Sequence, residues 1–256
     1  MAALATVLAA ASSANAQDWR FKLGIGGDYS TGDYGTGQAV NIWSVPIMAN
    51  AETGRWNLGF KVPYISITSA GDVVGGTDGA VVTKKKKIVG STARTTESGL
   101  GDMVGSVGYA VLAGNDGMPL LELTGKVKFP TASESNSLGT GEFDYTAQLD
   151  LSQAFGKVTP FGTIGYRIMG EPSGVDLDNI FFATVGAGYT FNRRVSAGLA
   201  LDYSQATTSG ADDAVEVSPY VSWDVTDRWG LLFYGLLGLS DGSPDSGGGV
   251  QITATF

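Results

Sequence analysis

The chain has 256 residues, a formal net charge of −9, 38 glycines and ten tyrosines, and it contains neither cysteine nor histidine. Lack of cysteine excludes disulfides and thiolate metal sites, and lack of histidine removes the commonest general base, which excludes Ser-His-Asp hydrolysis. No window holds the roughly 18 consecutive apolar residues that a transmembrane helix needs. Because the sequence also lacks a paired-carboxylate motif, we expect a protein that is not an enzyme and has no cofactor and no metal site.

The first sixteen residues combine a short apolar core with Ala14-Asn15-Ala16, a small-x-small cleavage motif. This pattern is typical of a secretory signal peptide. It departs from a complete signal because no Lys or Arg precedes the apolar core, so either the true start lies upstream or the signal is weak. A short buried helix is the alternative. We expect cleavage before Gln17, which divides the chain into a signal peptide over 1–16 and a mature domain over 17–256.

From Asp18 onward, apolar and polar side chains alternate with a period of two, which places them on opposite faces of β-strands. The alternating runs span residues 19–26, 40–47, 56–64, 102–111, 121–129, 143–152, 159–168, 181–191, 195–203, 215–224, 229–239 and 250–256. The second run loses its parity near Pro46, where we expect a β-bulge or an edge-like break. The longest irregular stretch covers residues 70–97.

The last run, Val250-Gln251-Ile252-Thr253-Ala254-Thr255-Phe256, alternates up to an aromatic carboxy-terminus. It looks like the closing strand of a bacterial outer-membrane β-barrel, and this resemblance implies that Phe256 is part of the signal read by the barrel assembly machinery. The odd-numbered connections are mostly longer than the even-numbered ones, as in barrels with short periplasmic turns and longer outer loops. We therefore predict an all-β fold, a closed antiparallel up-and-down transmembrane barrel over 17–256 with about twelve strands, in a range of about ten to fourteen. A secreted β-sandwich is the alternative.

In such a barrel, the apolar face of each strand meets lipid and the polar face lines the lumen. The charged residues predicted on the lumenal face are Lys22, Lys61, Asp102, Glu122, Lys126, Lys128, Asp144, Asp150, Arg167, Asp202, Glu216 and Asp224. Both signs occur, which is more typical of a salt-bridged interior than of a selective filter, because an unpaired buried charge is costly. We expect Lys126 and Lys128 to pair with Asp144 and Asp150 on the adjacent strand.

Two further features are predicted at the membrane boundaries. Four tryptophans fall beside short turns or the amino-terminus, where an interfacial aromatic girdle would lie: Trp19, Trp56, Trp223 and Trp229. The run Lys84-Lys85-Lys86-Lys87 falls in a predicted outer loop, where its ammonium groups could contact lipopolysaccharide phosphates. A solvated loop is the alternative for this run. We expect outer-membrane lipid as a partner and no nucleic acid.

Three short phrases resemble one family closely. They are Ser98-Gly99-Leu100-Gly101-Asp102-Met103, Lys126-Val127-Lys128-Phe129-Pro130-Thr131, and Leu138-Gly139-Thr140-Gly141 followed by Asp144. Together with the terminal Phe, they are similar to the outer-membrane transporter-like barrels grouped as the MetA pathway of phenol degradation family. The resemblance covers most of the mature chain, and it implies a passive channel for small solutes, including aromatic or other poorly permeant molecules.

The main hypothesis is therefore an outer-membrane β-barrel through which a small solute passes, with lumenal charges and loops selecting the solute. A barrel of about twelve strands has an interior that side chains can largely fill. The alternative is a non-transporting structural or surface-binding barrel whose outer loops carry the function. The sequence leaves the solute, the pore radius and the oligomeric state open.

Overall fold

The computed structural model describes residues 19–34, 38–69, 73–75, 81–83, 94–114 and 117–256. Two predicted features lie outside the described residues: the signal peptide over 1–16 and the Lys84–Lys87 run. Among the described residues, no helix is long and apolar enough to cross a membrane.

The described residues form fifteen β-strands. Their bounds are β1 (Arg20–Gly32), β2 (Val40–Thr53), β3 (Trp56–Ser69), β4 (Val73–Gly75), β5 (Val81–Thr83), β6 (Thr95–Leu100), β7 (Met103–Ala113), β8 (Leu120–Phe129), β9 (Asp144–Ser152), β10 (Val158–Ile168), β11 (Ile180–Thr190), β12 (Val195–Ser204), β13 (Ala214–Asp224), β14 (Trp229–Gly238) and β15 (Ser246–Thr255). The predicted irregular stretch over 70–97 is shorter than expected because β6 begins at Thr95.

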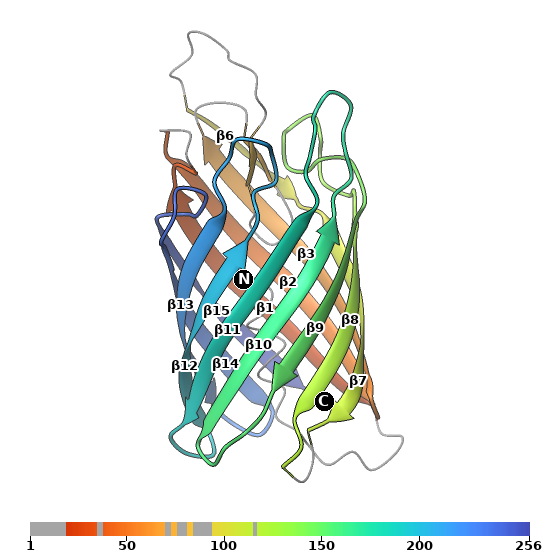
Figure 1. The fold of residues 1–256 in the computed structure, drawn as a ribbon, viewed down its shortest axis with the longest axis vertical. Coiled ribbons are helices and arrows are strands. Elements are labelled where there is room, and N and C mark those ends of the chain that lie inside the picture. Colours follow the sequence, from red (N-terminus) through yellow and green to blue (C-terminus); the bar gives the residue numbers. More distant parts are fainter. Residues whose placement is uncertain (1–18, 35–37, 70–72, 76–80, 84–93, 115–116) are drawn as a thin grey trace.

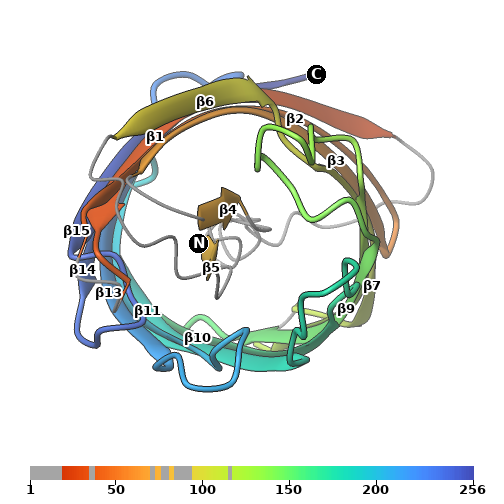
Figure 2. The same cartoon turned by 90° about the horizontal axis from the view of Figure 1, so that it is seen from above.

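The strands close into one antiparallel ring, in which β1 pairs with both β2 and β15 (Figures 1 and 2). β6 and β7 both pair with β3 and lie end to end, so they form a single barrel strand. The described strands therefore make a closed barrel of twelve strands, which confirms the predicted fold. β4 and β5 form a separate hairpin that falls within the outline of the ring in Figure 2.

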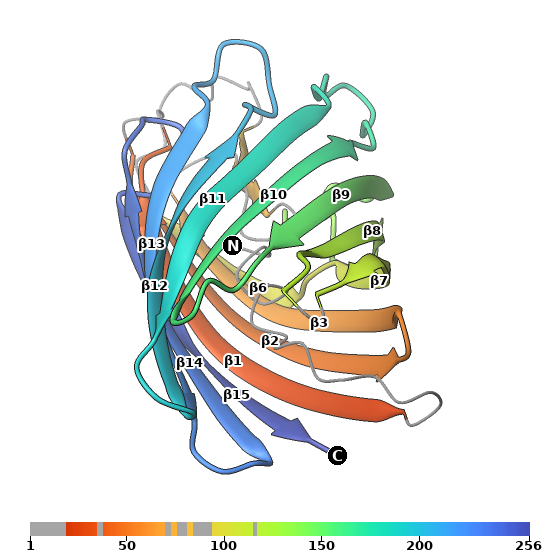
Figure 3. The same ribbon diagram turned by 60° about the horizontal axis from the view of Figure 1, so that its bottom comes forward.

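Short and long connections lie at opposite ends of the barrel (Figures 1 and 3). The short ones cover residues 54–55, 114–119, 153–157, 191–194 and 225–228, and they share their end with Trp19 and Phe256. We call this the turn end. The longer ones cover residues 33–39, 70–94, 130–143, 169–179, 205–213 and 239–245, and they define the loop end.

The outer face of the barrel is apolar along every barrel strand. Leu23, Ile164 and Val185, for example, are 54%, 53% and 61% exposed, whereas the alternating inward residues are largely buried. Closing the sheet pairs the backbone groups of every strand, which a bilayer requires. The four predicted girdle tryptophans are exposed at or next to strand termini at the turn end: Trp19, Trp56, Trp223 and Trp229.

No bulge occurs at Pro46, because the register between β2 and β3 runs without a shift from Asn41↔Thr68 to Thr53↔Trp56. The other expectation, a break, is met on the side of β1, where the ladder keeps its register but omits Gly26 and Gly27, opposite Pro46 and Val45. The apparent loss of parity has another cause. Val40 and Ile42 face inward and are buried, whereas Trp43, Val45 and Ile47 face outward and are exposed.

The register instead shifts opposite Pro63. Tyr64 pairs with Leu100 but Lys61 pairs with Val104, so the strand made by β6 and β7 carries one extra residue here. Proline has no N–H to donate to a ladder, and an extra residue lets the partner strand bend. Asp102 lies between β6 and β7 at this shift, where its backbone does not belong to the regular ladder.

Candidate functional site

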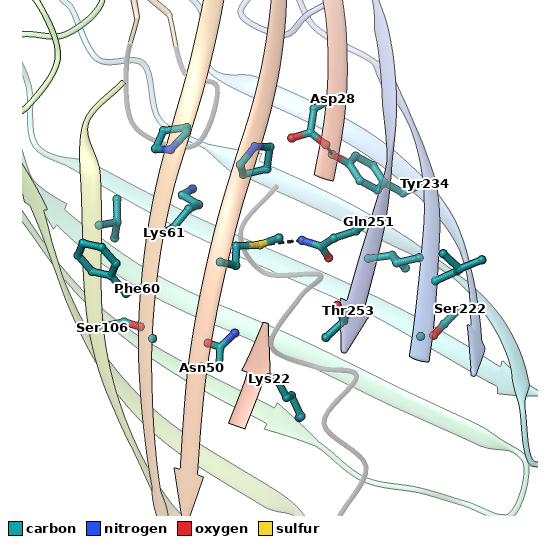
Figure 4. A pocket seen from close by; sticks show the side chains of 18 of the residues that line it. Lys22, Asp28, Asn50, Phe60, Lys61, Ser106, Ser222, Tyr234, Gln251 and Thr253 are labelled. Carbon is teal, nitrogen blue, oxygen red and sulfur yellow. Dashed lines mark hydrogen bonds between the residues drawn. The ribbon is translucent and has the colours of Figure 1, made fainter. Parts of the chain in front are cut away.

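The lumen holds a cavity of about 1040 Å³ along the inner wall of β1, β2, β3, β7, β8, β13, β14 and β15. Toward the loop end it is lined by apolar side chains: Ile42, Ile65, Ile67 and Leu138. Its middle is polar, as Figure 4 shows for Asn50, Ser106 and Gln251. Toward the turn end it is lined by charged residues: Arg20, Lys22, Glu52, Arg193, Arg194, Asp224, Asp227 and Arg228.

Six of the twelve predicted lumenal charges line this cavity. They are Lys22, Lys61, Asp102, Glu122, Lys126 and Asp224. Lys22 Nζ lies 2.6 Å from a carboxylate oxygen of Glu52 on the next strand, and Arg20 lies 3.8 Å from the other oxygen. The Thr124 hydroxyl donates to Glu122 over 3.2 Å. The wall of the cavity therefore carries both charge signs within a few ångströms of each other.

Two carboxylates on strands that line the cavity were missed by the sequence analysis. Asp28 on β1 accepts a hydrogen bond from the Tyr234 hydroxyl on β14, across the intervening strand β15 (Figure 4). Glu52 pairs with Lys22 as described above. Both were missed because the first two strands are longer than predicted, ending at Gly32 and Thr53. Continuing the two-residue period would have placed both carboxylates on the inward face.

The opposite wall is a polar network rather than a row of salt bridges. Asp150 accepts hydrogen bonds from the Thr163 hydroxyl at 2.6 Å and the Gln148 amide at 2.8 Å. Asp202 accepts from the hydroxyls of Thr184 and Ser218 at 2.6 and 3.1 Å. Hydroxyl and amide donors thus satisfy these carboxylates where we expected ammonium groups to do so.

Two more predicted charges lie on this inner wall. Arg167 donates from Nε to the Thr146 hydroxyl over 3.3 Å, and its guanidinium lies 5.8 Å from the centre of the Phe182 ring. Glu216 is half-buried on β13, on the same face as Ser218. All twelve predicted charges therefore lie on the inward side of the barrel, six of them away from the cavity.

The most buried charges form a cluster at the loop end. Lys128 Nζ lies 3.0 Å from Asp144 and 3.3 Å from Asp102, and it donates to the Thr140 hydroxyl over 2.8 Å. The exposed fractions of the Lys128, Asp102 and Asp144 side chains are 2%, 7% and 1%. Asp144 also accepts the Gly170 N–H, and Asp102 accepts the Ala132 N–H, each over 3.0 Å.

An inward aromatic cluster was not predicted. Phe161, Tyr220 and Leu232 are buried inside the barrel and pack together with Tyr234. The aromatic rings lie across glycines of neighbouring strands. A Cβ on Gly186 would overlap the Phe161 ring, for example. The glycines give these rings space against the wall, which an alternation pattern on one strand cannot reveal.

An apolar cluster lies at the loop end of the cavity. Val40, Ile42 and Ile67 face inward from β2 and β3, and Leu138 from the loop between β8 and β9 packs on them with only 2% of its surface exposed. Tyr34 packs against the same cluster, and burial raises the pKa of its hydroxyl to about 12.

The terminal residue completes the ring at the turn end. The Phe256 N–H donates to the Phe21 carbonyl over 2.8 Å, and the Phe21 N–H donates back over 3.2 Å. The Arg228 guanidinium lies 4.5 Å from the centre of the Phe256 ring, which is exposed. Within the described residues, no group of three or more acidic side chains is placed to hold a metal ion.

Comparisons with known proteins agree with this architecture. The family model described as putative MetA-pathway of phenol degradation matches residues 53–256. An outer membrane channel from Pseudomonas putida F1 superimposes with a TM-score of 0.70 and 13% sequence identity, covering 97% of this chain and 98% of that one. The translocator domain of the autotransporter NalP from Neisseria meningitidis superimposes with a TM-score of 0.51 and 9% identity, covering 100% and 92%. No curated protein matches this chain. At such identities these structures support the fold and not a shared function.

Proposed function

Because the chain belongs to the family described as putative MetA-pathway of phenol degradation, we propose that it is an outer-membrane channel through which small solutes pass passively. The observation that carries the proposal is the cavity of about 1040 Å³, which reaches from the charged turn end to Leu138 near the loop end. A cavity of this length along the lumenal wall offers room for a small solute between the two ends of the barrel.

The proposed solutes are small and aromatic or hydrophobic. The apolar section near the loop end, with Ile42 and Ile67, accommodates an apolar body, and the polar middle section offers amide and hydroxyl groups. The similar protein from Pseudomonas putida F1 is described as an outer membrane channel. In this proposal the protein performs no catalysis, and the solute crosses down its own concentration gradient.

The remaining partners follow from the same proposal. The signal peptide over 1–16 would direct the chain across the inner membrane, and Phe256 would be read by the barrel assembly machinery. The loop end would then face outward, where the Lys84–Lys87 run would meet lipopolysaccharide phosphates.

Conductance measurements and liposome-swelling assays test this proposal. The purified barrel is inserted into planar bilayers, and its conductance is recorded in KCl; proteoliposomes are then swollen in phenol-sized aromatic solutes and in sugars of equal mass. Steady conductance together with faster swelling in the aromatic series supports the proposal. A properly folded barrel that gives neither conductance nor swelling would contradict the proposed channel function.

One observation favours a second function. The loop between β8 and β9 is folded into the lumen and held by buried contacts. Such a loop is expected in a barrel that does not conduct and whose other loops bind a partner. Absence of conductance with the loops intact would favour this non-transporting, surface-binding protein.

A further inference from the structure

The three phrases on which the family resemblance rests meet at one place in the fold. Gly101 accepts a hydrogen bond from the Thr131 hydroxyl over 3.1 Å, and that hydroxyl accepts the Met103 N–H over 2.9 Å. Lys128 contacts Asp102 and Thr140. These contacts join the gap between β6 and β7, the end of β8, and the loop over 130–143.

Lys128 is the centre of this junction. A single ammonium group neutralises two carboxylates, and each carboxylate also accepts a backbone N–H from a loop, Ala132 for Asp102 and Gly170 for Asp144. Because this site is almost inaccessible to water, water does not compete for these ion pairs and hydrogen bonds, and each contact is stronger than it would be at the surface. The junction therefore fixes the two ends of the loop over 130–143.

The fixed loop turns into the barrel. Leu138 is buried against inward residues of β2 and β3, and a Cβ on Gly99 would lie 2.9 Å from Leu138 Cδ1. In Figure 2 the loop, in light green, falls inside the outline of the ring. Leu138 also lines the cavity at its loop end. A solute that entered the cavity from the loop end would pass close to this side chain.

We propose that the loop over 130–143 is the constriction that limits solute size, with Leu138 as its narrowing side chain and Lys128 as the residue that positions it. The inference rests on the proposed channel function. The loop has a structure of its own: the Leu138 N–H donates to the Ser133 carbonyl and the Ser137 N–H to the Glu134 carbonyl, each over 3.0 Å. It is therefore a fixed part of the passage.

The first experiment measures the size limit. Leu138→Ala is compared with wild type and with Leu177→Ala, which removes an equally buried leucine from the loop between β10 and β11, outside the cavity. Swelling of proteoliposomes is recorded with mono-, di- and trisaccharides, beside conductance. We expect Leu138→Ala to conduct more and to shift the size limit toward larger sugars, while Leu177→Ala keeps the wild-type limit.

The second experiment tests Lys128 without using transport. Since the chain has no cysteine, Leu138→Cys introduces a unique thiol, and Ser135→Cys at an exposed position is the labelled control. A membrane-impermeant maleimide is applied to intact cells. We expect little labelling of Leu138→Cys alone and strong labelling when Lys128→Met is added. Thr140→Val, which removes one of the Lys128 contacts, is the milder variant if Lys128→Met fails to assemble.

The outcomes separate the constriction from the channel. If wild type conducts and Leu138→Ala has the same size limit, the constriction is wrong and the channel stands. If wild type is closed and Leu138→Ala conducts, the constriction stands and passive transport by the native protein is wrong. Absence of conductance in every variant overturns both. Strong labelling of Leu138→Cys in the otherwise native chain would show that the loop does not hold position 138 against the barrel wall.

Discussion

The ammonium nitrogen of Lys128 lies 3.0 Å from a carboxylate oxygen of Asp144, directly opposite it in the register of β8 and β9. The contact is almost wholly excluded from water, and Asp102 shares the same ammonium group at 3.3 Å. Two buried carboxylates that share one cation make the cation hard to replace, because its removal leaves both charges uncompensated.

Lys128→Met should therefore lower the free energy of unfolding by about 3–5 kcal/mol, the usual cost of leaving buried charges unpaired. Lys126→Met on the same strand is the control and should cost less, since Lys126 is only half-buried. The measurement is urea unfolding of the barrel in lipid or detergent, followed by tryptophan fluorescence. Adding Asp144→Asn to Lys128→Met should recover part of the loss. If the two lysine variants unfold alike, the buried cluster does not stabilise the barrel.

Glycines of the barrel strands should tolerate alanine only where the new Cβ meets no neighbouring atom, as the inward Gly186 and the outward Gly125 illustrate. A Cβ on Gly186 would overlap the Phe161 ring and lie 2.6 Å from the Leu199 carbonyl oxygen, whereas a Cβ on Gly125 would meet nothing within 4 Å. Gly186→Ala should destabilise the barrel by about 1–3 kcal/mol, because the backbone oxygen cannot rotate away. Gly125→Ala should be neutral or stabilising by up to about 1 kcal/mol. Urea unfolding of both variants is the measurement, and equal midpoints would contradict the role of Gly186.

The sequence predicted the barrel well because alternation is a local signal. Residues 143–152 alternate cleanly, and β9 runs from Asp144 to Ser152. Alternation was misleading where apolar side chains face the lumen, as Val40 does, because we had assigned apolar side chains to the outer face. Alternation also gave no indication of the register shift at the junction of β6 and β7, because that shift lies opposite Pro63 on the partner strand.

Parity placed the lumenal charges on one face, and strand adjacency predicted the contact of Lys128 with Asp144, which are 3.0 Å apart. The remaining partners could not be predicted. Asp102 contacts Lys128 only because the register shifts beside Pro63 and because the loop over 130–143 turns inward. The inward position of Phe161 depends likewise on Gly186 of the adjacent strand. Such contacts depend on the pairing and shear of the whole ring, which a pattern within one strand does not contain.

The lumenal charges should set ion selectivity if the barrel conducts. Lys61 lines the cavity, and its side chain is labelled among the cavity residues in Figure 4. Lys61→Glu should shift the reversal potential in a KCl gradient toward cation selectivity, because a charge in a narrow low-dielectric passage acts strongly on passing ions. Lys157→Glu is the control. Lys157 is exposed in a turn and lies 5.9 Å from the centre of the exposed Tyr189 ring. Equal shifts for the two variants would contradict conduction past Lys61.

Phe256 should matter for assembly more than for the stability of the finished barrel. Its ring is 57% exposed and contacts Arg228, so its removal leaves no buried cavity, while its backbone still joins β15 to β1 through Phe21. Phe256→Ala should therefore reduce the amount of heat-modifiable barrel in the outer membrane, yet the assembled fraction should unfold near the wild-type urea concentration. Phe155→Ala, which truncates a similarly exposed ring at the turn end, should assemble normally. If Phe256→Ala assembles like wild type, the terminal ring is not part of the assembly signal. If it assembles poorly and also unfolds early, its role is structural, because a signal read only during assembly has no effect on the finished fold.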